Sequence, residues 1–257
     1  MSPREAETPR LHPTRVGLEP LPLADWLKPQ DGDPALLAER ARLIAAHCAD
    51  VVAALPEAES AVAELAALLR ERGIGIEHAN TALATLTALG RVLAEDICVL
   101  TPAEDGSYRL TAGILCFPNR WRLADKVGGS VLAVHGPVPD YAGHMSDGVD
   151  RFLARLKLER AYVRHNWGLS SSPDLFLPEP TPALNPFLDP RAGGPIFLRR
   201  ETQSFLKLPE TGAVIFAIRT AVTPWDKTPA DLRAEILATA DGLSPAWLKY
   251  KAILPKV

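Results

Sequence analysis

The chain has 257 residues, of which 47% are hydrophobic and 23% are charged, and its formal net charge is −3. This near-neutral balance lacks the basic field that draws a protein to nucleic acids or anionic membranes, and no apolar run reaches the length of a membrane span. Cys48, Cys98 and Cys116 lie far apart in apolar stretches without zinc or CxxC spacing, which is typical of buried thiols in a reducing compartment. Because the N-terminus also lacks an apolar signal core, we expect a cytoplasmic protein.

The proline-rich N-terminus predicts an extended arm over residues 1–30, from which Leu18, Leu21, Leu23 and Trp26 can dock on the body. Residues 31–257 are expected to form a single domain, since a chain of this length buries roughly three quarters of its unfolded surface without needing disulfides.

Three helices are predicted next. Asp33 and Pro34 form a helix start, with Asp as the N-cap and Pro in the first turn, and apolar residues at helical spacing continue to Pro56. A second helix is predicted from about residue 57 to residue 72, and a third from about residue 78 to residue 96.

After Asp96 the pattern changes to strands. Two β-like segments, ICVLTP and YRLTAGILCFP, flank Asp105-Gly106, which is a hairpin turn signal. WRLADKVGG predicts a short helix, and residues 140–158 predict an amphipathic helix. RAYVRHNWGL alternates as a strand, with Tyr162, Arg164 and Asn166 on one face and Val163, His165 and Trp167 on the other.

A proline-rich loop fills residues 170–195, and a loop of this length is usually functional or mobile. Two more strands follow, IFLRRETQSFLKLP and AVIFAIRTAVTP, and helices close the chain. This order favours an α+β fold in which N-terminal and C-terminal helices wrap an antiparallel sheet. Arg219 interrupts a strand that is otherwise nearly apolar, so its charge needs a partner or an anionic ligand.

The common enzyme motifs GxGxxG, GxxxxGK, GxSxG and HExxH are absent. Three histidines, His135, His144 and His165, share the central window of the chain, but their spacing is unlike that of a metal site. A single-histidine haem site demands less: one imidazole, an apolar pocket and cationic groups for the propionates. His135 follows an apolar run and precedes Gly-Pro-Val-Pro, so it is the candidate iron ligand.

Arginines at positions 120, 122, 199 and 219 are available for the propionates. On sequence physics alone, a core histidine bonded to a main-chain carbonyl is the commoner role for a residue such as His135. Trp121 and Trp167 are likewise more typical of a core, and Glu201 of an ordinary surface ion pair.

Several blocks occur in an order that resembles the haem-dependent oxidative N-demethylase alpha-subunit-like family, formerly a domain of unknown function. These blocks are GLEPLPLADWL, AEDICVL, CFPNRWRLADKVGG, VLAVHGPVPDY, VDRFLARL, RHNWGL, LRRETQSFLKLPETGAVIFAIRT and LKYK. They run from about Gly17 to Lys251, so the resemblance covers nearly the whole chain.

The resemblance implies a PAS-like core that binds haem b and oxidises a small secondary amine with dioxygen. It also implies electrons from a separate reductase that carries flavin and an iron–sulfur centre. His135 matches the histidine of the family's HxPVP-type motif, and Tyr141 follows in the same motif. Glu201 matches the acidic residue of the family's arginine–glutamate–glutamine pattern, with Arg199 and Gln203 on either side.

The resemblance thus implies His135 as the haem and metal ligand, with Arg120, Arg122, Arg199 and Arg219 binding the cofactor. Tyr141 and Glu201 are the implied catalytic residues. Thr202 and Ala221 replace a common arginine and an aromatic residue of the pattern, so the pocket and the amine it accepts are open. Two alternatives stay open beside the enzyme: a haem- or ligand-binding PAS-like sensor or carrier without turnover, and a structural partner that has lost its cofactor.

Overall fold

A computed structural model describes residues 17–27, 33–134, 146–179, 188–251 and 253–254. Seven strands form one antiparallel sheet in the order β1-β5-β6-β7-β3-β4-β2. The strands are β1 (Glu19–Leu21), β2 (Val52–Ala54), β3 (Asp96–Pro102), β4 (Tyr108–Ile114), β5 (Ala161–Ser170), β6 (Phe197–Lys207) and β7 (Val214–Pro224). The α-helices are α1 (Pro34–Ala46), α2 (Cys48–Val51), α3 (Glu59–Glu71), α4 (Ala82–Val92), α5 (Val131–Val134), α6 (Ser146–Arg155), α7 (Ala230–Asp241) and α8 (Pro245–Tyr250). The predicted combination of an antiparallel sheet with helices is confirmed.

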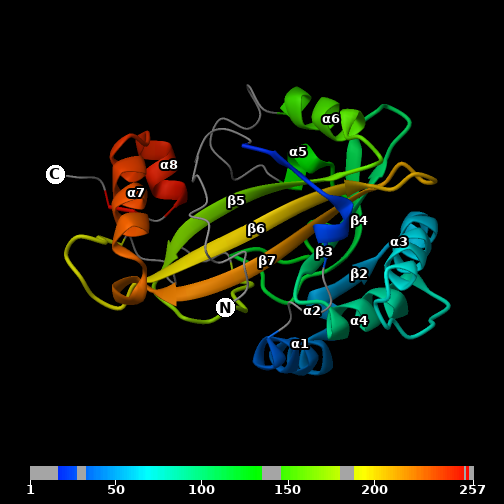
Figure 1. The fold of residues 1–257 in the computed structure, drawn as a ribbon, viewed down its shortest axis with the longest axis horizontal. Helices are drawn as coiled ribbons and strands as arrows, with labels where there is room; N and C mark the ends of the chain where they lie inside the picture. Colours follow the sequence, from blue (N-terminus) through cyan, green and yellow to red (C-terminus); the bar gives the residue numbers. More distant parts are fainter. Residues whose placement is uncertain (1–16, 28–32, 135–145, 180–187, 252, 255–257) are drawn as a thin grey trace.

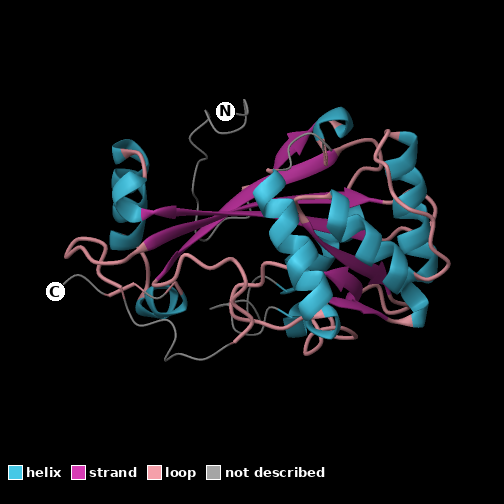
Figure 2. Ribbon diagram, turned by 90° about the horizontal axis from the view of Figure 1, so that it is seen from below, coloured by secondary structure: helices cyan, strands magenta, loops and turns pink. Residues whose placement is uncertain are grey.

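The helices gather at two ends of the sheet. The long strands β5, β6 and β7 run between α7 and α8 at one end and the group formed by α1, α3 and α4 at the other (Figure 1). Figure 2 shows the same two groups from below, with the strands spanning the distance between them. No helix in the described part of the chain is long and apolar enough to cross a bilayer.

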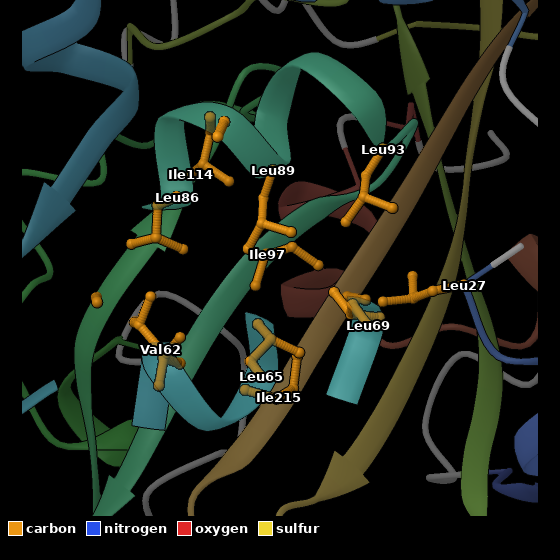
Figure 3. Close-up of a cluster of buried hydrophobic side chains, with 14 of the residues drawn as sticks. Leu27, Val62, Leu65, Leu69, Leu86, Leu89, Leu93, Ile97, Ile114 and Ile215 are labelled. Atoms are coloured by element: carbon orange, nitrogen blue, oxygen red, sulfur yellow. The ribbon is translucent and has the colours of Figure 1, made fainter. Parts of the chain in front are cut away.

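The larger core lies where α3 and α4 cover one face of the sheet (Figure 3). Thr81 caps α4 by accepting a hydrogen bond from the amide of Ala84 at 3.2 Å, which satisfies one free donor of the first turn. Both helices present one apolar stripe to the sheet. The side chains that meet there include Val62, Leu65, Leu69, Leu86, Leu89, Ile97, Ile114 and Ile215.

A second core lies on the opposite face, beneath α6. The Phe152 ring on α6 packs edge-on against Phe205 at 5.9 Å, and Phe205 stacks on Phe216 at 4.7 Å. Such aromatic pairs add stabilisation beyond the area that they bury. Val131 of α5 belongs to the same cluster, so the chain on both sides of residues 135–145 is fixed to this face.

Residues 17–27 pack on the body through β1, which pairs with β5, and through Trp26. Trp26 is fully buried, and its indole donates a hydrogen bond to the Ser204 hydroxyl at 3.0 Å. Leu21 and Leu23 pack against the same core.

The predicted helix from residue 33 to residue 56 is wrong in its second half. It ends at Ala46, a short α2 follows, and Val52–Ala54 form the edge strand β2 beside β4. The β-branched pair Val51-Val52 fits a pleated edge better than a helix, so pairing with β4 overrides the helical spacing.

Two smaller expectations are also wrong. Residues 121–129 form turns rather than a short helix, with the amides of Lys126 and Val127 both bonded to the Leu123 carbonyl. Cys98 and Cys116 are buried as expected, but Cys48 is exposed because it begins the short α2 at the surface.

Asp96 joins the helical layer to the sheet at the start of β3. Its carboxylate accepts hydrogen bonds from the Arg40 guanidinium at 2.6 Å and from the amides of Cys116 and Phe117 at 2.7 and 3.0 Å. Arg40 and Asp96 are both fully buried, and Arg40 also donates to the Gly90 carbonyl of α4 at 3.0 Å. One ion pair therefore holds α1, α4, β3 and the chain after β4 together.

The substitution Asp96→Asn should lower the free energy of unfolding by about 3–5 kcal/mol, because it leaves the buried Arg40 charge without its partner. Denaturant unfolding followed by circular dichroism measures the change. Glu39→Gln, which breaks the exposed ion pair with Arg42, is the matched control and should leave the midpoint almost unchanged. Equal effects from the two substitutions would contradict the role given to Asp96.

Candidate functional site

A row of polar side chains crosses the middle of the sheet. Glu201 on β6 lies directly opposite Asn166 on β5 and Thr220 on β7. Directly opposed residues of antiparallel strands point to the same face. Gln203, two positions along β6, lies on this face as well. We call this side of the sheet the Glu201 face.

Two neutral amides hold the Glu201 carboxylate. Asn166 donates from Nδ2 to Oε2 at 3.2 Å, and Gln203 donates from Nε2 to the same oxygen at 2.7 Å. The other oxygen, Oε1, lies 4.0 Å from Arg199 Nε and accepts no hydrogen bond from the described residues. The Glu201 side chain is only 13% exposed, so this is a nearly buried carboxylate with one oxygen available, unlike the surface pair expected from the sequence.

Two cations flank this carboxylate. Arg164 donates from Nε to Gln203 Oε1 at 2.6 Å and lies over the Phe205 ring at 5.7 Å. Lys251, just after α8, donates to the main-chain carbonyl of Trp167 at 2.6 Å and to Asn166 Oδ1 at 3.4 Å. The C-terminal segment is thus tied to β5 beside the Glu201 face.

Burial lowers the pKa of Lys251 to about 8, with the Glu201 charge opposing the shift and the Arg164 charge adding to it. The pKa of the Tyr250 phenol is raised by burial of its hydroxyl and by the charge of Glu201, although 44% of the surface of the whole residue is exposed. The Tyr250 hydroxyl therefore belongs to the same electrostatic environment.

Arg199 is 2% exposed and ties two loops together. Its guanidinium donates to the carbonyls of Phe117 at 2.6 Å and of Leu175 at 3.1 Å. Its Nε and the Thr220 hydroxyl are buried without a hydrogen-bond partner. Most of the guanidinium is thus engaged by the protein itself, while two polar atoms near Glu201 are left unsatisfied.

The other predicted arginines are dispersed. Arg120 has a left-handed backbone (φ 64°), and burial together with the Arg199 charge lowers its pKa. Arg122 forms a half-exposed ion pair with Glu179. Arg219 pairs with Glu95 at 3.4 Å on the face opposite Glu201, so the partner that its charge required is a carboxylate of the protein.

His135 and Tyr141, the predicted iron ligand and catalytic tyrosine, lie outside the described residues, as does His144. His165 is on β5 opposite Thr202, with Nδ1 3.3 Å from the threonine hydroxyl, on the face away from Glu201. Among the described residues, no three histidine, cysteine or acidic side chains come together as a metal site.

Sequence reasoning missed four residues that surround Glu201, namely Arg164, Asn166, Thr220 and Lys251. The alternation of RHNW does put Arg164 and Asn166 on one face, so a signal for these two was present. Lys251 closes LKYK, one of the blocks of the family resemblance, but nothing in its local pattern predicts a buried lysine.

An open depression of about 550 Å³ lies at the tip of the β3–β4 hairpin, away from these residues. It is lined by Glu57, Thr101, Pro102, Ala103, Glu104, Asp105, Arg109 and Thr111. This lining contains neither a histidine nor an aromatic wall, so it does not suit a haem.

The fold and the site define an antiparallel α/β protein with a carboxylate-centred polar face next to an aromatic core. Residues 70–255 match the family of haem-dependent oxidative N-demethylase, alpha subunit-like proteins. The match extends from the end of α3 over β3 to β7 and the C-terminal helices, so it contains all the residues of the Glu201 face. The chain belongs to this family.

The lowered pKa of Lys251 predicts how the free energy of unfolding depends on pH. It is about 8 in the folded chain and 10.5 in the unfolded chain, so between these values the unfolded state binds more protons and stability rises with pH. The free energy of unfolding of the wild type, minus that of Lys251→Met, should increase by up to about 3 kcal/mol from pH 8 to pH 10.5.

Guanidinium unfolding of both proteins at several pH values measures this difference, and subtraction removes the titration of tyrosines and cysteines that the two share. Lys249→Met, at an exposed position of α8 two residues earlier, is the control and should run parallel to the wild type. A difference that is flat or falls with pH would contradict the burial of the Lys251 charge.

Proposed function

We propose that the chain is a haem b protein that removes a methyl group oxidatively from a small secondary amine. The observation that carries the proposal is that α5, which ends one residue before His135, packs through Val131 into the hydrophobic core beneath α6. Phe205 belongs to the same cluster and alternates with Gln203 and Glu201 along β6. The described chain next to the candidate ligand, His135, therefore packs in the same core as the strand that carries Glu201.

The residues of this face fit a haem. Phe152, Phe205 and Phe216 offer an aromatic wall, and the cations Arg164 and Lys251 suit the propionates better than Arg122 or Arg219, which are held by Glu179 and Glu95. The unpartnered Arg199 Nε and Thr220 hydroxyl are further polar groups that a bound cofactor or substrate would satisfy. His135 is the proposed axial ligand, and Arg120 and Arg199 stay proposed members of the pocket wall.

The strand order supports a PAS-like core. Within the sheet, β4, β3, β7, β6 and β5 are consecutive neighbours, and β2 and β1 flank them at the two edges. A hairpin is therefore followed by a long connection and a three-stranded meander whose last strand returns beside the first. The connection that carries His135 lies between β4 and β5.

In the proposed reaction a secondary methylamine, dioxygen, two electrons and two protons give a primary amine, formaldehyde and water. The haem supplies the binding and activation of dioxygen, and a separate flavin and iron–sulfur reductase supplies the electrons. Glu201 Oε1 binds the protonated amine and takes up its proton, which gives the free lone pair that oxidation needs. Burial assists this step, because it disfavours the charged form of the amine. Tyr141 is the second proposed catalytic residue.

His135→Ala should abolish the Soret band of the purified or haem-reconstituted protein, since the proposed iron ligand is removed. His78→Ala, at an exposed loop position, is the matched control and should bind haem like the wild type. Absorption spectra with and without added imidazole measure both. Undiminished haem uptake by His135→Ala would refute the assignment of the ligand.

Glu201→Gln should keep the Soret band and lower amine-dependent oxygen consumption by about 100-fold, because the amide cannot accept the proton of the amine. Formaldehyde release with dimethylamine and an artificial reductant is the second readout, and Glu71→Gln on the exposed end of α3 is the control. A wild type that binds haem but consumes no oxygen with any small secondary amine would instead identify a sensor or carrier.

A further inference from the structure

The sheet carries a second set of polar side chains on the face opposite Glu201. One row across β5, β6 and β7 consists of His165, Thr202 and Arg219, and the next consists of Trp167, Arg200 and Ala221. Because these positions alternate with Asn166, Glu201 and Thr220, they point away from the Glu201 face. We call this set the Arg200 face.

The Arg200 face lies between two covered parts of the sheet. On one side, Trp26 covers Ser204, the next residue of β6 on this face. On the other, Leu198 and the Trp167 ring itself belong to the core beneath α7 and α8. Between them Thr202 and Arg200 are half-buried and Ala221 is exposed. In Figures 1 and 2 this is the stretch of β5 to β7 between the two groups of helices, and solvent reaches part of it.

Two hydrogen-bond donors on this face have no partner. Trp167 is 3% exposed, and its indole Nε1 is buried without a hydrogen bond. The same holds for Nε of Arg200, whose guanidinium forms no ion pair with the described residues. Trp167 and Arg200 are direct cross-strand neighbours, so their Cβ atoms lie about 5 Å apart. Buried N–H groups without an acceptor are rare in native proteins, and two adjacent ones indicate a missing acceptor.

The charges nearby favour an anion. Glu95 neutralises Arg219 at 3.4 Å, whereas Arg200 has no such partner. Glu19 lies further along, opposite Val163, at an exposed position. A second cation, Lys251 Nζ, lies 4.6 Å from the centre of the Trp167 ring. Burial lowers the pKa of His165; the charge of Glu19 opposes this shift, and the charge of the Arg200 guanidinium adds to it. Its fork of N–H groups matches the two oxygens of a carboxylate or a phosphate.

We propose that the Arg200 face is a binding site for an oxyanion, either a carboxylate or a phosphate, which Arg200 and the indole N–H of Trp167 hold together. His165 and Thr202 line the same site. The site lies across the sheet from Glu201 and needs neither haem nor amine, so its test is independent of the proposed oxidation.

The indole N–H signals of the ¹⁵N-labelled full-length protein report binding directly. The chain has 5 tryptophans, and Trp167→Phe identifies the signal of Trp167. Inorganic phosphate and acetate are titrated separately at constant ionic strength, balanced with chloride. The expected result is a saturable shift of the Trp167 signal with at least one of the two anions. A response to phosphate alone or to acetate alone identifies which oxyanion the site takes.

Arg200→Gln should weaken the binding about 10-fold, as expected for the loss of a charge-assisted hydrogen bond. Arg200→Lys keeps the charge but not the fork and should give an intermediate affinity, which provides a second variant if the glutamine variant does not fold. Arg91→Gln, on the exposed side of α4, is the matched control with unchanged affinity. The proposal is overturned if neither anion gives a saturable shift, if chloride gives the same one, or if Arg200→Gln binds like the wild type.

Discussion

The buried carboxylate of Asp96 is the constraint on which the arrangement of the sheet and the helical layer depends. Burying a carboxylate in an apolar core is strongly unfavourable unless its charge is paired and its oxygens are hydrogen-bonded. Arg40 and two main-chain amides meet these requirements, and they come from α1 and from the chain just after β4. The start of β3, which carries Asp96, is therefore fixed relative to α1 and to the chain after β4, because any displacement would leave a buried charge unpaired.

This constraint extends to the candidate site. The amide of Phe117 is held by Asp96, and the carbonyl of the same residue accepts a hydrogen bond from Arg199. Arg199 is two residues from Glu201 on β6, which Asn166 connects to Lys251 at the C-terminus. Consecutive polar contacts thus run from α1 across the sheet to the residue after α8. The position of the Glu201 carboxylate is set by residues that are distant in sequence, which gives the rigidity that a site for a small amine requires.

The elements that the sequence predicts correctly are those with a strong local signal. The Asp105-Gly106 turn, the Asp33 cap and the apolar β7 each specify their structure from within a few residues. The alternation in β5 gives the correct faces for Arg164 and His165. The edge strand β2 and the end of α1 are missed because they depend on pairing with β4, and a pattern within one segment does not contain that pairing.

The site is harder to predict, for the same reason. Glu201 and Arg219 lie in neighbouring strands, and the family resemblance implies that both belong to one site. The register places Arg219 opposite Thr202, and one position of offset in a strand moves a side chain to the other face of the sheet.

The arginines therefore have separate tasks. Arg199 holds two loops, Arg219 pairs with Glu95, and Arg200 forms no ion pair with the part of the chain that the structure describes. The charged residues along β6 and β7 look like one binding site in the sequence. In the sheet they lie on two faces with different chemistry. A carboxylate held by amides lies on one face, and the guanidinium of the proposed anion site lies on the other.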